Sequence, residues 1–452
     1  MSKLLLFIFS LVYVKGCYWN NQCPYSLYGS KTPYDTVRGD IRDYTIPDNC
    51  EAVSIWTMNR HGNRNPDKKV IAGIKRVLAI RDEILANYDQ NNSELCAQDI
   101  ENFSKWTWNS TIEQSQSFLT GFGYEELYNI AKRLREKYNY LLQGSADQFY
   151  FRPTDEQRTV TSCMAFVHGL TDGVNLDVTV EHPTKRDDVL RPYKHCDRYQ
   201  KDVKRGVTLT AEIESYFKSP EFVALQARVQ KRLGIKTQLT ADNVYSMYEM
   251  CRFYRSWSDN LQDPWCAVFT NEDIQMLEYY DDVWHYYRNG YGYQVNVDLG
   301  KIALKDLYEN FEAVVSGQGR KVVSYFTHDT MMEMVYSAMG LYKDAAPLSS
   351  QIRKPNRLWR TSHIGTFSTN LIAVLNRCNE TSDQTYRIQL FINEEVTPIC
   401  PLEGCSWQDF QDKFQVYAST NLDFCSMDYD YPPADNSLPN SAALHSGFLR
   451  WN

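Results

Sequence analysis

The chain has 452 residues, of which 43% are hydrophobic and 14% aromatic, and its formal net charge at pH 7 is −8. This composition excludes a disordered protein, and the length suits one large domain with an insertion or a partner domain. The acidic charge excludes a general attraction for nucleic acid, so an anionic ligand would need a local basic pocket.

The first 16 residues have the pattern of a secretory signal peptide. Lys3 precedes an almost continuous apolar run at residues 4–14, which is too short to span a membrane. The chain has 12 cysteines, spread along its length, which indicates an oxidising compartment. Asn-X-Ser/Thr glycosylation sequences agree with export and occur at Asn91, Asn102, Asn109 and Asn379. We therefore predict a secreted or lumenal glycoprotein with no membrane span.

The remaining pattern predicts an α/β protein with a helical insertion, preceded by a polar N-terminal arm at residues 17–50. We expect strands at residues 52–58, 148–151, 321–326, 366–375 and 386–393. We expect amphipathic helices at 70–88 and 124–142, a helix after Arg158 that runs through Leu170, and a helix after Thr330 that runs through Met339. Residues 89–120 would form an exposed polar segment. Residues 51–184 and 301–452 would form an α/β domain with a mainly parallel sheet. Residues 185–300, rich in charged and aromatic side chains, would form an inserted, mainly α-helical domain.

The most informative motif is Arg60-His61-Gly62-Asn63-Arg64-Asn65-Pro66, just after the first predicted strand. Guanidinium groups are planar, permanently charged forks that suit phosphate oxygens, and an imidazole held between two of them can attack the phosphorus. The glycine allows the backbone to approach a ligand closely. The alternative is a cationic surface turn with a solvated histidine.

Two more predicted strands lead into candidate residues. Arg158 follows the second strand, and His328 and Asp329 follow the third. Because parallel strands of one sheet end at the same edge, we expect these residues to meet the first motif there. Each also has an ordinary structural explanation: His328 as a core histidine, Asp329 as a helix N-cap, and Arg158 as an ion-pair partner of Asp155 or Glu156.

Together, these residue types suit phosphoryl transfer to a histidine. Arginines would bind the phosphate oxygens, a neutral histidine would attack in line, and a carboxylic acid would protonate the leaving alcohol and then act as base for water. The sequence has no Gly-rich phosphate loop, and no two cysteines have the two-residue spacing of a zinc site. We therefore expect a small anionic phosphoester as substrate, with no cofactor and no metal.

The motif at residues 60–66, Arg158 and His328-Asp329 resemble the corresponding parts of the histidine acid phosphatase branch of the histidine phosphatase superfamily. Within that branch, the chain is most similar to the multiple inositol polyphosphate phosphatases. This further similarity lies in Gly29-Ser30-Lys31-Thr32-Pro33-Tyr34, Gly290-Tyr291-Gly292-Tyr293 and Leu390-Phe391-Ile392-Asn393-Glu394-Glu395. The resemblance implies a three-layer, doubly wound fold and a phosphatase that forms a phosphohistidine intermediate.

The resemblance also implies a role for each candidate residue. His61 would be the nucleophile and Asp329 the proton donor, with His328 beside them in the catalytic set. The phosphate would be held by Arg60, Arg64, Arg158 and His328, whereas Lys69 would either contact a further phosphate or be exposed to solvent. The family pattern suggests the disulfides Cys50–Cys378, Cys251–Cys266 and Cys400–Cys405.

The chain departs from the family pattern at the proton donor. The inositol polyphosphate group usually carries His-Ala-Glu, with the acid two positions after the histidine, where this chain has His328-Asp329-Thr330. Here the acid directly follows the histidine, as in the general acid phosphatases and many phytases; Glu333 is a weaker donor candidate. Three functions follow for consideration. They are hydrolysis of inositol polyphosphates, broad-specificity acid phosphatase activity on small phosphomonoesters, and non-catalytic binding of phosphoesters by a secreted protein.

Overall fold

The computed structural model describes residues 17–21, 24–88, 92–258, 260, 262–380 and 383–431. The predicted signal peptide and the glycosylation residue Asn91 lie outside the described residues. Asn109 and Asn379 are exposed, as a glycan requires, but Asn102 is buried. The prediction that Asn102 carries a glycan therefore disagrees with its position in the fold.

The strands form one mixed sheet in the order β3-β2-β4-β1-β5-β6-β7, with β8 paired to β6. Its parallel part consists of β3 (Thr179–Val180), β2 (Phe149–Pro153), β4 (Val322–Thr327) and β1 (Cys50–Arg60), and its antiparallel part of β5 (Asn370–Glu380), β6 (Asp383–Ile392), β7 (Glu395–Val396) and β8 (Cys405–Ser406). Arg60 pairs with Thr327, and Pro153 pairs with Phe326. The ends of β1, β4 and β2 therefore lie side by side at one edge.

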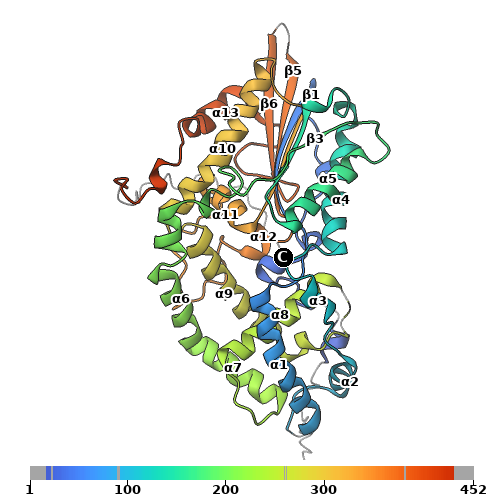
Figure 1. Cartoon of the computed structure of the whole chain (residues 1–452), viewed down its shortest axis with the longest axis vertical. Helices are drawn as coiled ribbons and strands as arrows, with labels where there is room; N and C mark the ends of the chain where they lie inside the picture. Colours follow the sequence, from blue (N-terminus) through green and yellow to red (C-terminus); the bar gives the residue numbers. More distant parts are fainter. Residues whose placement is uncertain are drawn as a thin grey trace, which may run out of the picture.

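Helices cover both faces of this sheet (Figure 1). One side carries α10 (Gln294–Val315), α11 (Asp329–Ala338) and α13 (Trp407–Phe414), and the other carries α4 (Gly121–Tyr138) and α5 (Gln157–Thr171). Successive side chains of a strand point to opposite faces, so Trp56 and Met58 of β1 join one core and Ile55 joins the other. The predicted three-layer α/β fold class is confirmed, with a sheet that is parallel around β1 and β4 and antiparallel beyond β5.

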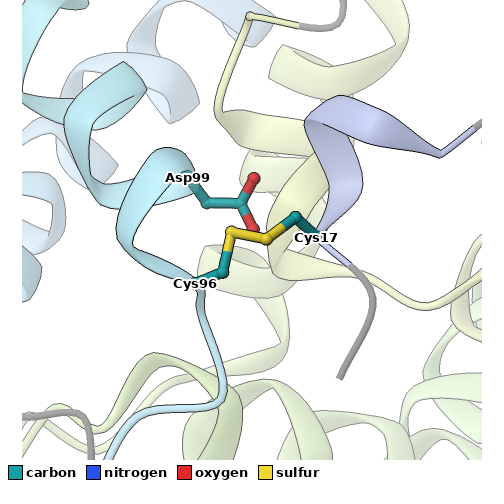
Figure 2. Close-up of side chains that lie close together, drawn as sticks. All are labelled: Cys17, Cys96 and Asp99. Atoms are coloured by element: carbon teal, nitrogen blue, oxygen red, sulfur yellow. A yellow bond between two sulfur atoms is a disulfide. The ribbon is translucent and has the colours of Figure 1, made fainter. Parts of the chain in front are cut away.

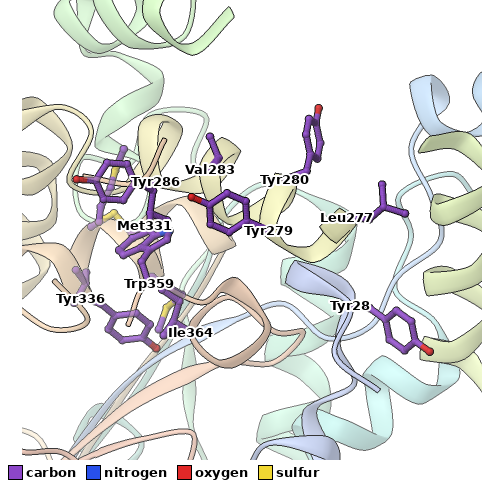
Figure 3. Packing of buried hydrophobic residues seen from close by; sticks show 14 of the residues in the cluster. Tyr28, Leu277, Tyr279, Tyr280, Val283, Tyr286, Met331, Tyr336, Trp359 and Ile364 are labelled. Carbon is purple, nitrogen blue, oxygen red and sulfur yellow. The ribbon is translucent and has the colours of Figure 1, made fainter. Parts of the chain in front are cut away.

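Residues 185–300 are largely helical. They contain η7 (Pro192–Lys194), the π-helical turn η8 (Tyr199–Val203), α6 (Val207–Lys218), α7 (Pro220–Leu233), α8 (Ala241–Trp257), η9 (Trp265–Val268), α9 (Asn271–Asn289) and the start of α10. Thr240 and Thr270 form capping boxes at the starts of α8 and α9. Buried aromatic residues of α9, among them Tyr286, pack near Met331 and Trp359 (Figure 3), which joins the helical region to the helices on the sheet.

The region between the first two long helices is more ordered than expected. After α1 (Lys68–Asn87), the chain forms α2 (Ala97–Lys105) and α3 (Thr111–Gln114). Phe103 is fully buried, with its ring centroid 5.4 Å from that of Trp265. The prediction of a wholly exposed segment at 89–120 is therefore wrong, because one aromatic anchor on a short helix leaves too little periodicity to detect.

Five disulfides connect the described residues: Cys17–Cys96, Cys50–Cys378, Cys196–Cys425, Cys251–Cys266 and Cys400–Cys405. The three bridges that the family pattern implies are confirmed. Asp99 lies beside the Cys17–Cys96 bridge (Figure 2), but the two sulfurs are bonded to each other and so offer no thiolate to a metal. Within the described ranges, no helix combines the length and apolar character needed to cross a membrane.

Candidate active site

The ends of β1 and β4 bring the two candidate histidines together. His61 follows β1, and its backbone N–H donates to the carbonyl of Thr327 at 3.0 Å. His328 directly follows Thr327 in the chain, and the ring centroids of His61 and His328 lie 5.6 Å apart. Both rings border one pocket, which we call the active-site pocket, lined by His61, Arg64, Glu156, Arg158, Tyr193, Lys194, Tyr199, Gln200, Lys204, Arg288, His328, Asp329 and Thr330.

The hydrogen bonds of His61 define which ring nitrogen is available. Its Nδ1 lies 2.8 Å from the carbonyl oxygen of Gly62, which can only accept, so Nδ1 carries the proton and Nε2 keeps its lone pair. Burial lowers the pKa of His61 well below its usual value, and the positive charges of Arg158 and Arg60 lower it further. His61 is therefore neutral and has the nucleophilic nitrogen that phosphoryl transfer requires.

His328 is held in the opposite tautomer. A guanidinium Nη2 of Arg158 lies 3.3 Å from Nδ1 and can only donate, so Nδ1 accepts. The Nε2–H then donates to Oγ1 of Thr154, at 3.1 Å. Burial, followed by the charge of Arg158, lowers the pKa of His328 well below its usual value. His328 is thus a neutral histidine that lines the pocket directly after β4, with partners from α5 and from the residue after β2.

Arg60 is completely buried behind the pocket wall. Its Nη1 donates to the carbonyls of Ser30 and Gly365, both at 2.6 Å, and its guanidinium lies over the ring of Phe367. Nη2 lies 3.1 Å from Oδ2 of Asp329. Arg60 is not among the residues that line the pocket. In the free protein its guanidinium is paired with Asp329, the predicted proton donor.

Asp329 is the first residue of α11 and lines the pocket. Burial by itself would raise the pKa of its carboxyl group, but the charges of Arg60 and His285 outweigh burial and hold the pKa well below the usual range. The carboxyl group is therefore ionised in the free protein. It must gain a proton on substrate binding if it is to protonate a leaving group.

The other two arginines of the predicted clamp line the pocket. Arg64 donates from Nη1 to the carbonyl of Asn65 at 2.8 Å. Arg158 forms an ion pair with Glu156 at 3.1 Å and also contacts His328. It therefore has both the ion-pair partner and the place in the pocket that were considered for it from the sequence. The two arginines leave part of their donor capacity unused by these contacts, as a phosphate-binding pair requires.

Two further candidates lie elsewhere. The side chain of Lys69 is exposed in the first turn of α1, and Lys69 is not among the residues that line the pocket. Glu333 is fully buried and accepts hydrogen bonds at Oε2 from His285 at 2.8 Å and Asn289 at 2.9 Å. The pocket therefore places Asp329, and not Glu333, beside His61.

Three cations from the helical region also line the pocket, but they were not singled out from the sequence. Lys194 belongs to η7, Lys204 follows the π-helical turn η8, and Arg288 belongs to α9, with its guanidinium over the ring of Tyr199 at 5.4 Å. π-helical turns occur often at functional sites. No local pattern marks these residues, because charged residues are frequent throughout this helical region.

The arrangement suits a phosphoryl-transfer enzyme, with a neutral histidine, a carboxyl group and arginines around one pocket. Comparison with known families agrees: the chain belongs to the histidine phosphatase superfamily (branch 2), whose model matches residues 54–393.

Several relatives of known name are similar over most of the chain. Multiple inositol polyphosphate phosphatase 1 of Drosophila melanogaster is 32% identical over 411 residues, covering 87% of this chain and 86% of the relative, and the Homo sapiens protein of that name is 25% identical, covering 82% of each. Among solved structures, the phytase from D. castellii has a TM-score of 0.69 at 18% identity, covering 89% of this chain and 85% of that one. The multiple inositol polyphosphate phosphatase of Bifidobacterium longum in complex with inositol hexasulfate has a TM-score of 0.61 at 16% identity, covering 83% and 93%. These two structures support the fold.

Proposed function

We propose that the protein is a phosphatase that hydrolyses phosphomonoesters of inositol polyphosphates through a phosphohistidine intermediate. The observation that carries this proposal is the shared pocket of a neutral His61, with Nδ1 protonated, and the carboxyl group of Asp329, bordered by Arg64 and Arg158. Those side chains supply a nucleophile, a proton carrier and two anion-binding forks. They need no resident metal to act.

In the first half-reaction, Nε2 of His61 attacks the phosphorus and the ester P–O bond breaks. The leaving oxygen takes a proton from Asp329, which gives the free alcohol and a phosphohistidine. In the second half-reaction, the Asp329 carboxylate takes a proton from a water molecule as that water attacks the phosphorus. The N–P bond then breaks, which releases inorganic phosphate and restores neutral His61.

The negative charge of the bound substrate favours protonation of Asp329, which is ionised in the free protein. A phosphate dianion bound beside Arg64 and Arg158 adds negative charge to the pocket and offsets the field of the arginines. This raises the pKa of the Asp329 carboxyl group toward that of an acid able to donate. Substrate binding and proton uptake are therefore expected to be coupled.

The further cations that line the pocket favour a substrate with several phosphates. Lys194, Lys204 and Arg288 add three positive charges to those of Arg64 and Arg158, in a chain whose net charge is negative. A simple monoester needs only one phosphate clamp, whereas a polyphosphate can engage both groups of cations at once. This distribution supports inositol polyphosphates over the second candidate, broad-specificity hydrolysis of small phosphomonoesters.

We also propose that the protein acts in the extracellular space or in the lumen of the secretory pathway. Five disulfides, together with exposed glycosylation sequences at Asn109 and Asn379, support this location.

The testing experiment is phosphate release by the secreted protein from phytate and from p-nitrophenyl phosphate, at several pH values between about 4 and about 7.5 with EDTA present. Strong release from phytate supports the proposal. Turnover of the aryl ester alone would favour a general acid phosphatase. No turnover of either by the folded protein would favour the non-catalytic binding protein.

A further inference from the structure

We propose that Glu126 positions His61 through the peptide group between Gly62 and Asn63. The inference rests on the proposed function, in which His61 is the nucleophile. Glu126 belongs to α4 and is not among the residues that line the pocket, so it acts on His61 from outside. It would be a positioning residue of the reaction.

Two hydrogen bonds at opposite ends of one peptide unit carry the argument. Nδ1–H of His61 donates to the Gly62 carbonyl at 2.8 Å, and the N–H of Asn63, in the same peptide unit, donates to Oε2 of Glu126 at 2.8 Å. Because the peptide unit is planar, a hydrogen bond that fixes its N–H also fixes the direction of its carbonyl. Hydrogen bonds at both ends also polarise the unit and strengthen each other. Glu126 thereby orients the acceptor that holds the imidazole.

The same carboxyl oxygen also reaches the other side of His61. Oγ of Ser368 donates to Oε2 of Glu126 at 2.8 Å, and the Ser368 backbone N–H donates to the carbonyl of His61 at 3.2 Å. Ser368 has a φ of 57°, in the left-handed region that serine rarely occupies. The surrounding contacts therefore maintain an unfavourable backbone conformation here, as is common at functional sites. One oxygen atom connects the two backbone segments that determine where His61 lies.

Close backbone packing brings Glu126 within reach. A Cβ atom on Gly62 would overlap the backbone of Gly123 in the first turn of α4, and a Cβ atom on Gly123 would overlap the backbone of Asn63. Only a pair of glycines lets α4 lie this close to the motif loop. Glu126 is one turn further along the same helix.

The contact depends on an acceptor oxygen and not on charge. Burial raises the pKa of Glu126 to about 7, against the effect of its hydrogen bonds from Asn63 and Ser368, so the group is largely uncharged in mildly acidic solution. A neutral carboxyl group keeps one oxygen as acceptor, as does the amide of glutamine. Glutamine should therefore replace Glu126 with little loss, whereas alanine should not.

The test compares Glu126→Ala and Glu126→Gln with the wild type, using Thr120→Val as a matched control. Oγ1 of Thr120 donates to the carbonyl and side-chain oxygens of Asn63 and accepts from the Gly123 N–H as the N-cap of α4. Its replacement therefore disturbs both the same loop and the start of α4, but removes neither of the two hydrogen bonds of the Gly62–Asn63 peptide unit. We expect Glu126→Ala to lower kcat by about 10²-fold, since a misplacement of about 1 Å has that effect, with KM for phytate changed by less than about 2-fold. Glu126→Gln and Thr120→Val should keep kcat within about 3-fold of the wild type.

A second measurement does not depend on activity. Nitrogen NMR of the free protein labelled at histidine, with His61 assigned by comparison with His61→Ala, reports which ring nitrogen carries the proton. The wild type and Glu126→Gln should show the Nδ1–H tautomer, and Glu126→Ala a mixture of both. If the wild type releases no phosphate but this tautomer change occurs, the proposed function fails and the positioning role of Glu126 stands.

Several results would overturn the inference. They are an unchanged tautomer in folded Glu126→Ala, a rise in KM with kcat preserved, or an equal loss of kcat in Thr120→Val. If Glu126→Ala does not fold, the decision rests on Glu126→Asp, whose shorter side chain withdraws the acceptor oxygen from the Asn63 N–H. Retention of both wild-type kcat and the wild-type tautomer in that variant would contradict the proposal.

Discussion

Nη2 of Arg60 lies 3.1 Å from Oδ2 of Asp329, an ion pair between the end of β1 and the start of α11. Arg60 is completely buried, and its other terminal nitrogen is held by two backbone carbonyls, so it cannot move toward a ligand without breaking contacts. In the free protein it acts as a fixed positive charge that keeps Asp329 ionised. Phosphate binding and protonation of Asp329 should therefore occur together.

We predict that Asp329→Asn lowers the rate of hydrolysis most for substrates with poor leaving groups. An alkyl phosphate, such as an inositol phosphate, should lose about 10²- to 10⁴-fold in kcat, because the departing alkoxide must be protonated. An activated aryl phosphate should lose much less. Steady-state kinetics on phytate and p-nitrophenyl phosphate measure the ratio, and equal losses on both would remove Asp329 from the donor role.

His61→Ala should abolish turnover while leaving the fold intact, since the side chain carries the nucleophile and its backbone hydrogen bonds remain. Rapid quenching of the wild type during turnover should trap a phosphohistidine that the variant lacks. The exposed histidine His168 of α5 provides the matched control, because its Nδ1 lies 3.0 Å from the hydroxyl of Tyr124 of α4 at the protein surface. Comparable inactivity of His168→Ala, or a phosphohistidine that persists in His61→Ala, would reject this assignment.

Substitution of the pocket cations from the helical region should affect polyphosphates selectively. Lys204→Ala or Arg288→Ala removes a charged donor, and such hydrogen bonds contribute about 1.5–3 kcal/mol, which corresponds to about a 10- to 100-fold rise in KM for phytate. The KM for p-nitrophenyl phosphate should change by less than about 2-fold. Lys69→Ala, at an exposed position, serves as the control and should leave both values unchanged. If KM rises equally for the two substrates, these cations do not bind additional phosphates.

The stability of the protein should fall as the pH drops below about 6.5, partly because of the two pocket histidines. Their pKa values are lower in the folded protein than in the unfolded chain, so the unfolded chain binds more protons in this range. The stabilisation is present above the unfolded pKa and is lost as pH falls, by at most about 1.4 kcal/mol per pH unit for each histidine. Urea unfolding of His61→Ala should show a shallower loss between about pH 6.5 and about pH 5 than the wild type. Parallel curves would contradict the buried neutral state of His61.

Much of the site could be predicted from local sequence. The apolar residues before Arg60 and before His328 predict buried strands, and both strands are present as β1 and β4. Because adjacent parallel strands end at one edge, the convergence of the two histidines also followed from the pattern. The side-chain amide of Asn63, within the motif, donates to the Ser256 carbonyl of α8, a contact that the local sequence does not predict.

Other properties depend on contacts between distant parts of the chain. The charge of Asp329 is determined by Arg60, and the tautomer of His328 by Arg158 and Thr154. Lys204 and Arg288 reach the pocket only because η8 and α9 pack near the sheet edge, and nothing in their neighbouring residues distinguishes them from other surface cations.

The sequence by itself determined the residue types of the chemistry, the strands that carry them and the family to which the chain belongs, because strand periodicity and short motifs depend on neighbouring residues. Only the tertiary structure decided the protonation state of each group, the exposed position of Lys69, the further cations that line the pocket and the contact between Glu126 and the His61 loop. Burial and the distances between charges control these properties, and both arise from the packing of segments that are far apart in the chain.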